Sequence, residues 1–238
     1  MEIDGKRALV LGGTAGIGLA AARSLEASGA RVVVASRSAS QRDRAKEGLS
    51  NDAELRDVDI RDRDALSLLF ASLAPIDILV CAATGGDRAI GPFLQMDLDG
   101  FQGSFDKLWG YTNAVRLGAE HMSADGTIVL VSGSPARNCK PGMSAISTVG
   151  NAVEGFVRAV APELVPRRIN VVSPGTIVTE MFSPDLDKSA AIGANITQNN
   201  LLPRAGLPEE VAQAILFLVE NDFVTGTTVD VDGGALLS

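Results

Sequence analysis

The chain has 238 residues, of which 46% are hydrophobic and 21% are charged, as in an ordinary globular protein. Asp and Glu outnumber Lys and Arg by 29 to 21, so the formal net charge is −8 and we expect neither nucleic acid nor a membrane as a partner. No apolar stretch approaches the roughly 18 residues of a membrane span, and the acidic start does not resemble a signal peptide, so we predict a cytoplasmic protein. Two Cys and one His are too few for a Cys/His zinc cluster, so no metal is expected.

The first predicted strand (7–13) runs into a glycine-rich turn, "GGTAGIG", that leads into a helix (17–30). In such a turn, backbone N–H groups and the helix N-terminus face a pyrophosphate, and glycine keeps the approach free of side chains. We therefore predict a dinucleotide site, although a purely structural turn is the alternative. The predicted contacts are Gly12, Thr14, Gly16, Ile17 and Gly18.

The second predicted strand (31–37) ends where the adenosine ribose of a dinucleotide would lie. An Asp or Glu there would bind a free 2′-hydroxyl group, but this sequence has Ser36, Arg37 and Ser38. A guanidinium beside a hydroxyl suits a 2′-phosphate. The sequence therefore favours NADP(H) over NAD(H), the alternative being that Arg37 is only a solvated loop residue.

The remaining apolar runs alternate with helical patterns to the end of the chain. Further strands are predicted within 53–62 and at 76–84, 126–134, 168–175 and 227–234, with helices at 63–74 and 142–164. Near-continuous apolar strands indicate a sheet that is covered on both faces. We predict an α/β fold: one Rossmann-type doubly wound domain over 1–238, with a seven-stranded, mostly parallel sheet and helices on both faces. The weakly patterned insertion 181–203 is predicted to be a substrate lid.

Several segments together resemble the short-chain dehydrogenase/reductase family over nearly the whole chain. They are "GGTAGIG", "DVDI" (57–60), "DILVCAAT" (77–84), "INVVSPGTIVTEM" (169–181) and "LPEEVAQAILFLVENDFVTGTTVDVDGG" (207–234). The resemblance implies an adenine contact at Asp59 and a carboxamide contact through Ile177 and Thr179. The further cofactor contacts expected in these segments are Ile60, Ala82, Ala83, Thr84, Pro174 and Gly175.

The family's catalytic residues are an Asn, a Ser, a Tyr and a Lys, and the resemblance maps their places onto this chain. "NAVEGFVRAVAPEL" (151–164) aligns without gaps to the family's helix after the Lys, which puts Ile146 in the Tyr place and Gly150 in the Lys place. The only tyrosine is Tyr111, and no lysine follows it by four residues. The usual Tyr-x-x-x-Lys proton relay is therefore absent from this divergent member.

The same alignment places Lys107 where the family has Asn, and Gly133 where it has Ser, between Ser132 and Ser134. In the family, the places of residues 107 and 150 face one pocket. The Lys107 ammonium is therefore predicted to reach the nicotinamide ribose or the substrate and to act as the acid, with Ser132 or Ser134 orienting the substrate. The alternative is that Lys107 fills a void or pairs with a carboxylate.

Three functions remain open. The first is an NADP-dependent oxidoreductase that acts on a small carbonyl or alcohol with a non-standard proton relay. The second is a non-redox isomerase, lyase or cyclase on the same scaffold, and the third is an inactive NADP-binding sensor or partner subunit. The first is favoured because "SPGTIVTE", which resembles the segment around the nicotinamide, is intact. The resemblance also implies a homodimer or homotetramer.

Overall fold

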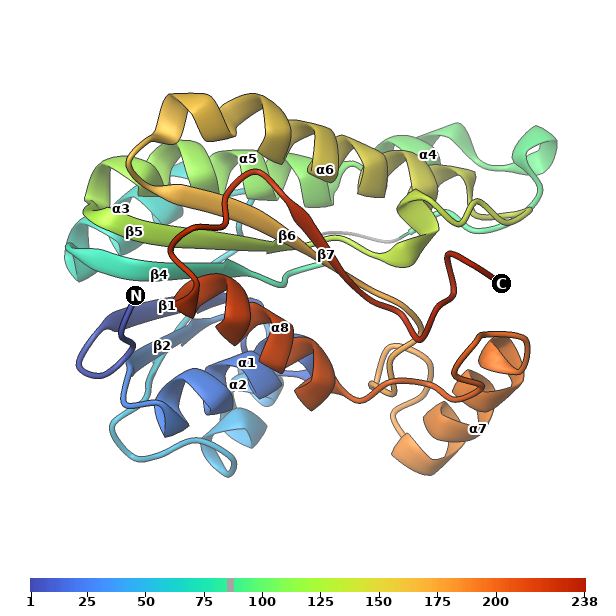
Figure 1. The fold of residues 1–238 in the computed structure, drawn as a ribbon, viewed down its shortest axis with the longest axis horizontal. Coiled ribbons are helices and arrows are strands. Elements are labelled where there is room, and N and C mark those ends of the chain that lie inside the picture. Colours follow the sequence, from blue (N-terminus) through green and yellow to red (C-terminus); the bar gives the residue numbers. More distant parts are fainter. Residues whose placement is uncertain (85–87) are drawn as a thin grey trace.

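The fold, seen in a computed structural model that describes residues 1–84 and 88–238, is built on one parallel sheet (Figure 1). Within these residues, seven strands lie in the order β3-β2-β1-β4-β5-β6-β7, and every neighbouring pair is parallel. The strands are β1 (Arg7–Leu11), β2 (Arg31–Ala35), β3 (Glu54–Arg56), β4 (Ile76–Cys81), β5 (Met122–Val131), β6 (Arg168–Pro174) and β7 (Thr228–Val231). The predicted doubly wound α/β fold is confirmed.

Helices cover both faces of this sheet. They are α1 (Gly16–Ala27), α2 (Ala39–Lys46), α3 (Arg63–Leu73), α4 (Leu98–Gly103), α5 (Asp106–Gly118), α6 (Ser144–Leu164), α7 (Leu186–Thr197) and α8 (Pro208–Glu220), with short 3-10 turns η1 (Phe93–Gln95), η2 (Ala119–His121) and η3 (Ser134–Ala136). In Figure 1, α3, α5 and α6 lie on one face and α1, α2 and α8 on the other. Element α7 lies apart from both layers, near the C-terminal segment.

Each face of the sheet has its own apolar core. In β1, Leu9 and Leu11 join the core under α3, α5 and α6, whereas Ala8 and Val10 join the core under α1 and α8. All four side chains are fully buried. Because consecutive residues of a strand point to opposite faces, a strand buried on both sides has a continuous apolar sequence, as this one does.

Several strands are shorter than their apolar runs, because glycines end them. The first strand stops at Leu11, since Gly12 has φ +80°, and the last stops at Val231, ahead of Gly233 with φ +64°. Such left-handed backbone leaves the extended conformation and is favourable only for glycine. The fifth strand instead begins earlier than predicted, at Met122, with an irregular register beside β4.

The insertion 181–203 contains a helix that the hydropathy pattern does not reveal. The buried positions of α7 are Ser189, Gly193 and Thr197, spaced by four residues, and none of them is a large apolar residue. The Ser189 hydroxyl donates to the Thr179 carbonyl at 2.7 Å. Asp185 caps the helix by accepting from the N–H groups of Asp187 and Lys188. The helix therefore packs through small residues, two of them polar, and a pattern of large apolar residues is absent from this face.

Candidate cofactor and catalytic site

The glycine-rich turn after β1 has the geometry of a phosphate cradle. A Cβ on Gly12 would lie 2.5 Å from the Ala83 nitrogen, and one on Gly18 would lie 2.1 Å from the Gly12 carbonyl oxygen. Helix α1 begins directly in this turn, at Gly16, with no side-chain cap and no acidic residue in its first turn. Its first N–H groups are thus left for an anion, and the residues fit a dinucleotide pyrophosphate.

This turn also meets the segment that follows β6. A Cβ on Gly16 would lie 3.1 Å from the Thr179 Cγ2 atom. Thr179 is buried, and Ile177 on the same segment is bridged to Gly206. Gly175 donates its N–H to the Val231 carbonyl at 3.0 Å, and Pro174 pairs with Val231 at the end of β6. The residues predicted to contact the pyrophosphate and those predicted to contact the carboxamide therefore lie next to each other.

The polar corner after β2 holds Ser36 and Arg37. The Thr14 hydroxyl donates to the Ser36 hydroxyl at 2.9 Å, so the turn and the corner are joined. A second guanidinium, that of Arg42 on α2, donates to the Ser36 carbonyl and pairs with Asp57 at 3.0 Å. Sequence analysis missed Arg42 because α2, with strongly polar composition, has almost no amphipathic pattern. Ser38 caps α2 by accepting from the Gln41 N–H.

Asp59 lies beside the same corner as part of an ion-pair cluster. Its carboxylate accepts from Arg61, whose Nη2 is 2.8 Å away, and pairs with Arg37 at 3.5 Å. The hydrogen bonds from Arg61, reinforced by the charge of Arg37, hold the pKa of Asp59 at about 2. Ile60 is buried, and its carbonyl accepts from the Asn113 amide at 3.2 Å. Asp59 is therefore a fixed anion beside Arg37 and Arg61.

The residues that follow β4 lie beside the glycine-rich turn. The Ala82 N–H donates to the Leu11 carbonyl at 2.8 Å, which holds the chain beside the glycine-rich turn. Ala82 and Ala83 are half-buried and Thr84 is exposed. Ala82 and Ala83 thus lie against Gly12 of the turn.

Lys107 lies at the centre of the predicted catalytic region. From the start of α5, its Nζ donates to the Ser132 carbonyl at 3.2 Å and lies 5.6 Å from the Tyr111 ring centroid. The Ser132 hydroxyl in turn donates to the Gly150 carbonyl at 3.2 Å. Burial, together with a smaller effect of the charge of Arg88, lowers the pKa of Lys107 to about 8. Lys107 is thus linked through Ser132 to the place where the family has its lysine.

The space beside Gly150 is closed by the turn η3. A Cβ on Gly150 would lie 2.8 Å from the Ala136 Cβ, so no larger side chain fits there without moving that turn. Ile146, one turn earlier on α6, is half-buried. Ser134 begins η3 and is buried, with its carbonyl accepting from the Arg137 N–H. Of the two serines, Ser132 is the one that contacts Lys107.

Tyr111 does not take the place of the family's tyrosine. It is 1% exposed, and its hydroxyl donates to the Val131 carbonyl at 3.2 Å. Burial raises the pKa of this hydroxyl well above its ordinary value. Tyr111 is therefore a core residue that lies beside Lys107, with its hydroxyl engaged by the Val131 carbonyl.

With this geometry in place, comparison with known proteins decides the family. The protein-family model described as Enoyl-(Acyl carrier protein) reductase matches residues 12–235. The short-chain dehydrogenase/reductase ATR9 of Stachybotrys chlorohalonatus is 33% identical over 260 residues, covering 99% of this chain and 98% of that protein. The chain belongs to the short-chain dehydrogenase/reductase family.

Two solved structures add detail to this relationship. A small-chain dehydrogenase in complex with NADPH is 27% identical and has a TM-score of 0.80, with 99% of this chain and 100% of that chain covered. The MalC reductase/Diels-Alderase from Malbranchea aurantiaca is 26% identical and has a TM-score of 0.86, with 99% and 97% covered. This short-chain dehydrogenase/reductase is thus similar to one protein bound to NADPH and to one with two named activities.

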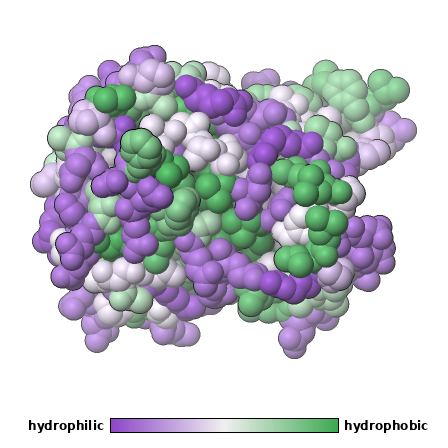
Figure 2. Space-filling model, in the orientation of Figure 1, coloured by the Kyte–Doolittle hydropathy of each residue, from purple (hydrophilic) through white to green (hydrophobic). Residues whose placement is uncertain are grey.

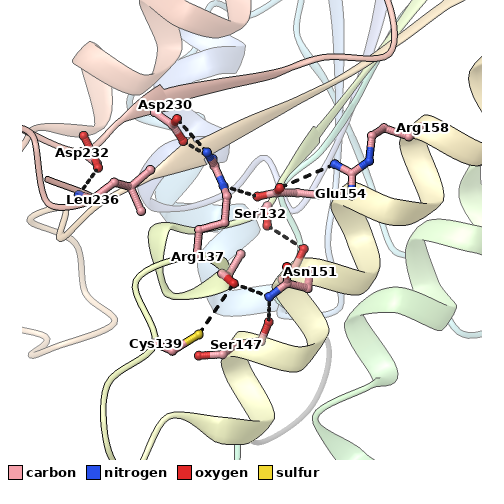
Figure 3. A network of polar contacts seen from close by, with 12 residues as sticks. Ser132, Arg137, Cys139, Ser147, Asn151, Glu154, Arg158, Asp230, Asp232 and Leu236 are labelled. Atoms are coloured by element: carbon pink, nitrogen blue, oxygen red, sulfur yellow. Dashed lines mark hydrogen bonds and ion pairs between the residues drawn. The ribbon is translucent and has the colours of Figure 1, made fainter.

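One network in this short-chain dehydrogenase/reductase was not foreseen from sequence (Figure 3). Arg137, just after η3, donates to the buried carboxylate of Glu154 on α6 at 3.2 Å and to Asp230 on β7 at 3.0 Å. Glu154 also pairs with Arg158 at 3.8 Å. The network therefore fastens the turn that closes the space at Gly150. The signal in the sequence was weak, since its members are separated by up to 93 residues.

In the part of the chain that the structure describes, no group of three or more His, Cys, Asp or Glu side chains is placed to hold a metal ion. None of the helices formed by residues 1–84 and 88–238 combines the length and hydropathy needed to cross a bilayer.

Proposed function

We propose that this family member is an NADP-dependent oxidoreductase that acts on a small carbonyl or alcohol substrate with Lys107 as its acid and base. The observation that carries the proposal is the Lys107 ammonium, which is hydrogen-bonded to the Ser132 carbonyl and has a pKa of about 8. A proton donor with a pKa near neutrality serves efficiently as a general acid. Lys107 thereby does the work of the absent tyrosine.

The choice of NADP(H) is supported at the adenosine corner. Arg37 and the Ser36 hydroxyl stand where an acidic residue would repel a 2′-phosphate. Arg42 adds a second guanidinium beside Ser36. The relative solved with NADPH is consistent with the same cofactor here.

In the reduction, each residue of the site has a separate role. NADPH, when bound by the residues of the glycine-rich turn and the adenosine corner, would be the source of the hydride for the carbonyl carbon. Lys107 gives its proton to the carbonyl oxygen, which becomes a hydroxyl, and then regains a proton from water. The Ser132 carbonyl holds the ammonium in place, and the Gly150 carbonyl holds Ser132. In the alcohol-oxidation direction, neutral Lys107 accepts the proton, so the same group serves both directions.

The segment 181–203 is proposed to be the substrate lid of a single domain. Ser189 joins α7 to the Thr179 carbonyl, so the helix is fastened to the predicted carboxamide contact. Large apolar side chains remain exposed on and around it, and Figure 2 shows apolar surface at the end of the molecule where α7 and the C-terminal segment lie. They include Met181, Leu186, Leu201, Leu202 and Leu237.

A transfer experiment tests the redox proposal directly. The full chain is incubated with NADPH carrying deuterium at C4 and a panel of small aldehydes, ketones and oxo acids, and products are examined by mass spectrometry. Deuterium should appear on the carbonyl carbon with the wild-type protein, and Lys107→Ala should reduce the rate at least 100-fold, within the range of a lost general acid. Transfer that survives Lys107→Ala unchanged would remove the role given to Lys107.

A non-redox, ring-forming enzyme is the second candidate function. It is favoured by the missing Tyr/Lys pair and by the similarity to a protein named both reductase and Diels-Alderase. A bound nicotinamide and a shaped cavity would then orient a reactive substrate without hydride transfer. Product formation from a diene-bearing substrate without NADPH consumption would support this reading. Binding of NADPH with neither outcome would support the sensor reading.

We also propose that the protein is a cytoplasmic homodimer or homotetramer. Trp109, on the same helix as Lys107, is 57% exposed, so part of the α5 surface has a large apolar side chain to bury. Light scattering coupled to size-exclusion chromatography would give the mass in solution, and a monomer over a wide concentration range would contradict the oligomer.

A further inference from the structure

The segment that follows β5 is bound to α6 by side chains from both elements (Figure 3). The Ser132 hydroxyl, at the start of this segment, donates to the Gly150 carbonyl at 3.2 Å. The next residue of the helix, Asn151, donates its side-chain amide to the Ala136 carbonyl at the end of η3. Both ends of the short segment from Ser132 to Ala136 are therefore bound to consecutive residues of α6.

A charged contact continues this attachment one turn later on the helix. Arg137 donates to the Glu154 carboxylate at 3.2 Å and to Asp230 on β7 at 3.0 Å. The Glu154 side chain is 4% exposed, and a buried carboxylate is costly without a close partner. The other partner, Arg158, is 3.8 Å away and exposed, so Arg137 is the main counter-ion of Glu154. The end of η3 is therefore held to α6 by a contact that is costly to break.

The attached segment carries the hydrogen-bond acceptor of the proposed acid. The Lys107 Nζ donates to the Ser132 carbonyl at 3.2 Å, so the direction of that carbonyl affects where the ammonium lies. The Ala136 N–H donates to the Gly133 carbonyl at 2.9 Å, which closes η3 directly after Ser132. A displacement of the Ala136 end of the turn is therefore transmitted to the peptide group that contains the Ser132 carbonyl.

Resting on the role of Lys107 in the proposed oxidoreductase, we propose that Asn151 and Arg137 are positioning residues for the Lys107 ammonium. Both hold η3 against α6, and both act through the Ser132 carbonyl. Their contribution to the reaction is to keep the acid in a fixed place. A catalytic group that is misplaced by about 1 Å can lose roughly 100-fold in rate, so such a contribution is measurable.

The titration of Lys107 tests this proposal without any substrate. The full chain is labelled with carbon-13 at the lysine Cε atoms, and the signals are followed by NMR from neutral to alkaline pH, with Lys107→Met identifying the signal of Lys107. The Lys107 pKa is about 8 mainly because of burial, so a loosened turn that admits water should raise it by about 0.5–1 pH unit. Asn151→Ala should produce this rise, since it removes the bond to Ala136 without changing a charge.

Two matched controls lie on the same helix. Thr148→Ala removes a hydroxyl bond to the Ser144 carbonyl, at 2.8 Å within α6, and should leave the Lys107 pKa unchanged. Arg158→Gln removes the exposed partner of Glu154 and should also leave it unchanged.

Arg137 supplies a second pair of variants, so that the test does not depend on one substitution folding. Arg137→Gln should raise the Lys107 pKa, and Arg137→Lys, which keeps the charge, should recover part of the wild-type value. Each of these variants retains Arg88, whose charge acts on Lys107, and Tyr111, whose ring centroid lies 5.6 Å from the Lys107 Nζ. A change in the titration therefore reports on the attachment of η3.

Amide hydrogen exchange shows whether the turn itself has loosened. The N–H groups of Ala136 and Arg137 donate to carbonyls within the turn, and they should exchange about 10-fold faster in Asn151→Ala. Faster exchange with an unchanged or lower Lys107 pKa would overturn the positioning role. Unchanged exchange in both Asn151→Ala and Arg137→Gln would show that neither residue holds the turn, and would overturn it as well.

Kinetics then separate the positioning role from the function on which it rests. In Asn151→Ala, kcat at pH 7 should fall about 10-fold, KM should change by less than about 2-fold, and the loss of activity at alkaline pH should move upward with the Lys107 pKa. A raised Lys107 pKa in a protein that transfers no deuterium would leave the positioning role and reject the oxidoreductase. Deuterium transfer with normal kcat and an unshifted Lys107 pKa in Asn151→Ala and Arg137→Gln would leave the oxidoreductase and reject the positioning role.

Discussion

Gly150 and Ala136 lie so close together that a Cβ on Gly150 would be 2.8 Å from the Ala136 Cβ. The contact joins the middle of α6 to η3, which Arg137 fastens to Glu154 and Asp230. Restoring a lysine at residue 150 would therefore require this fastened turn to move. The absence of a lysine at residue 150 is therefore coupled to the tight packing against Ala136. Gly150→Lys alone would not recreate the family's relay.

Gly150→Ala should destabilise the protein, although alanine favours helices. Overpacking costs about 1–3 kcal/mol, against a gain in helix propensity of at most about 1 kcal/mol. Gly155 lies on the same helix, and a Cβ there would meet only the Arg158 Nη2 atom, at 4.0 Å. Gly155→Ala should therefore stabilise the protein by about 0.5–1 kcal/mol. Denaturant unfolding measures both variants, and stabilisation by both would contradict the tight contact.

Lys107→Met should make the protein more stable at pH 7. The Lys107 pKa in the folded chain is about 8, below the ordinary 10.5, so at pH 7 the folded protein carries the full cost of a desolvated ammonium. Removing it should add about 1–2 kcal/mol to the free energy of unfolding.

The same pKa difference predicts a pH dependence. Between pH 8 and 10.5 the unfolded chain binds more protons at this residue than the folded chain, so the contribution of Lys107 to stability rises with pH across that window. Lys107→Met should lose this rise, and Lys46→Met, which removes a surface lysine, should retain it. Parallel pH profiles for Lys107→Met and the wild-type protein would contradict the lowered pKa. Reductase activity should correspondingly fall as pH rises through about 8, because the acid form disappears.

Arg37→Ala should weaken NADPH binding selectively. A lost charge-assisted contact costs about 1–3 kcal/mol, or roughly a 5- to 150-fold increase in the NADPH dissociation constant, whereas NADH, without a 2′-phosphate, should change little. Arg44→Ala, which removes an exposed arginine from the last turn of α2, serves as the control. Fluorescence titration with both cofactors gives the comparison. An equal loss for NADH and NADPH would mean that Arg37 does not read the phosphate.

Ser189→Ala should loosen α7 without unfolding the domain. The substitution removes the hydrogen bond to the Thr179 carbonyl, worth about 1 kcal/mol. Amide hydrogen exchange within 186–197 should become about 5-fold faster, and bound NADPH should slow it in the wild-type protein. Ser67→Ala removes a similar hydroxyl-to-carbonyl bond on α3 and should leave exchange in α7 unchanged. Unaltered exchange in Ser189→Ala would contradict the fastening role of this residue.

Much of the fold could be predicted from sequence, because its strands are buried on both faces and its glycines mark where they end. The run before Gly12 predicted β1, and the motif around Gly16 predicted the start of α1. Helices α2 and α7 were missed because neither buries a stripe of large apolar residues. Apolar periodicity reports how a helix packs, and it gives no signal when the packing is polar or absent.

The candidate site could be predicted only in part. Lys107 was singled out from sequence, but its bond to the Ser132 carbonyl depends on backbone atoms, which residue identities do not specify. Contacts between distant segments, such as Arg137 with Asp230, likewise emerge only in three dimensions.

The small inner face of α7 has a consequence for how the protein can change over evolutionary time. Ser189, Gly193 and Thr197 are the buried positions of the helix, whereas Ile192 and Ile196 are 39% and 44% exposed. Mutations at the two isoleucines therefore alter the outer surface of the helix while its attachment stays intact. Substitutions at these two positions should therefore cost little stability. The outer surface of the helix can then change during evolution while its buried residues stay the same.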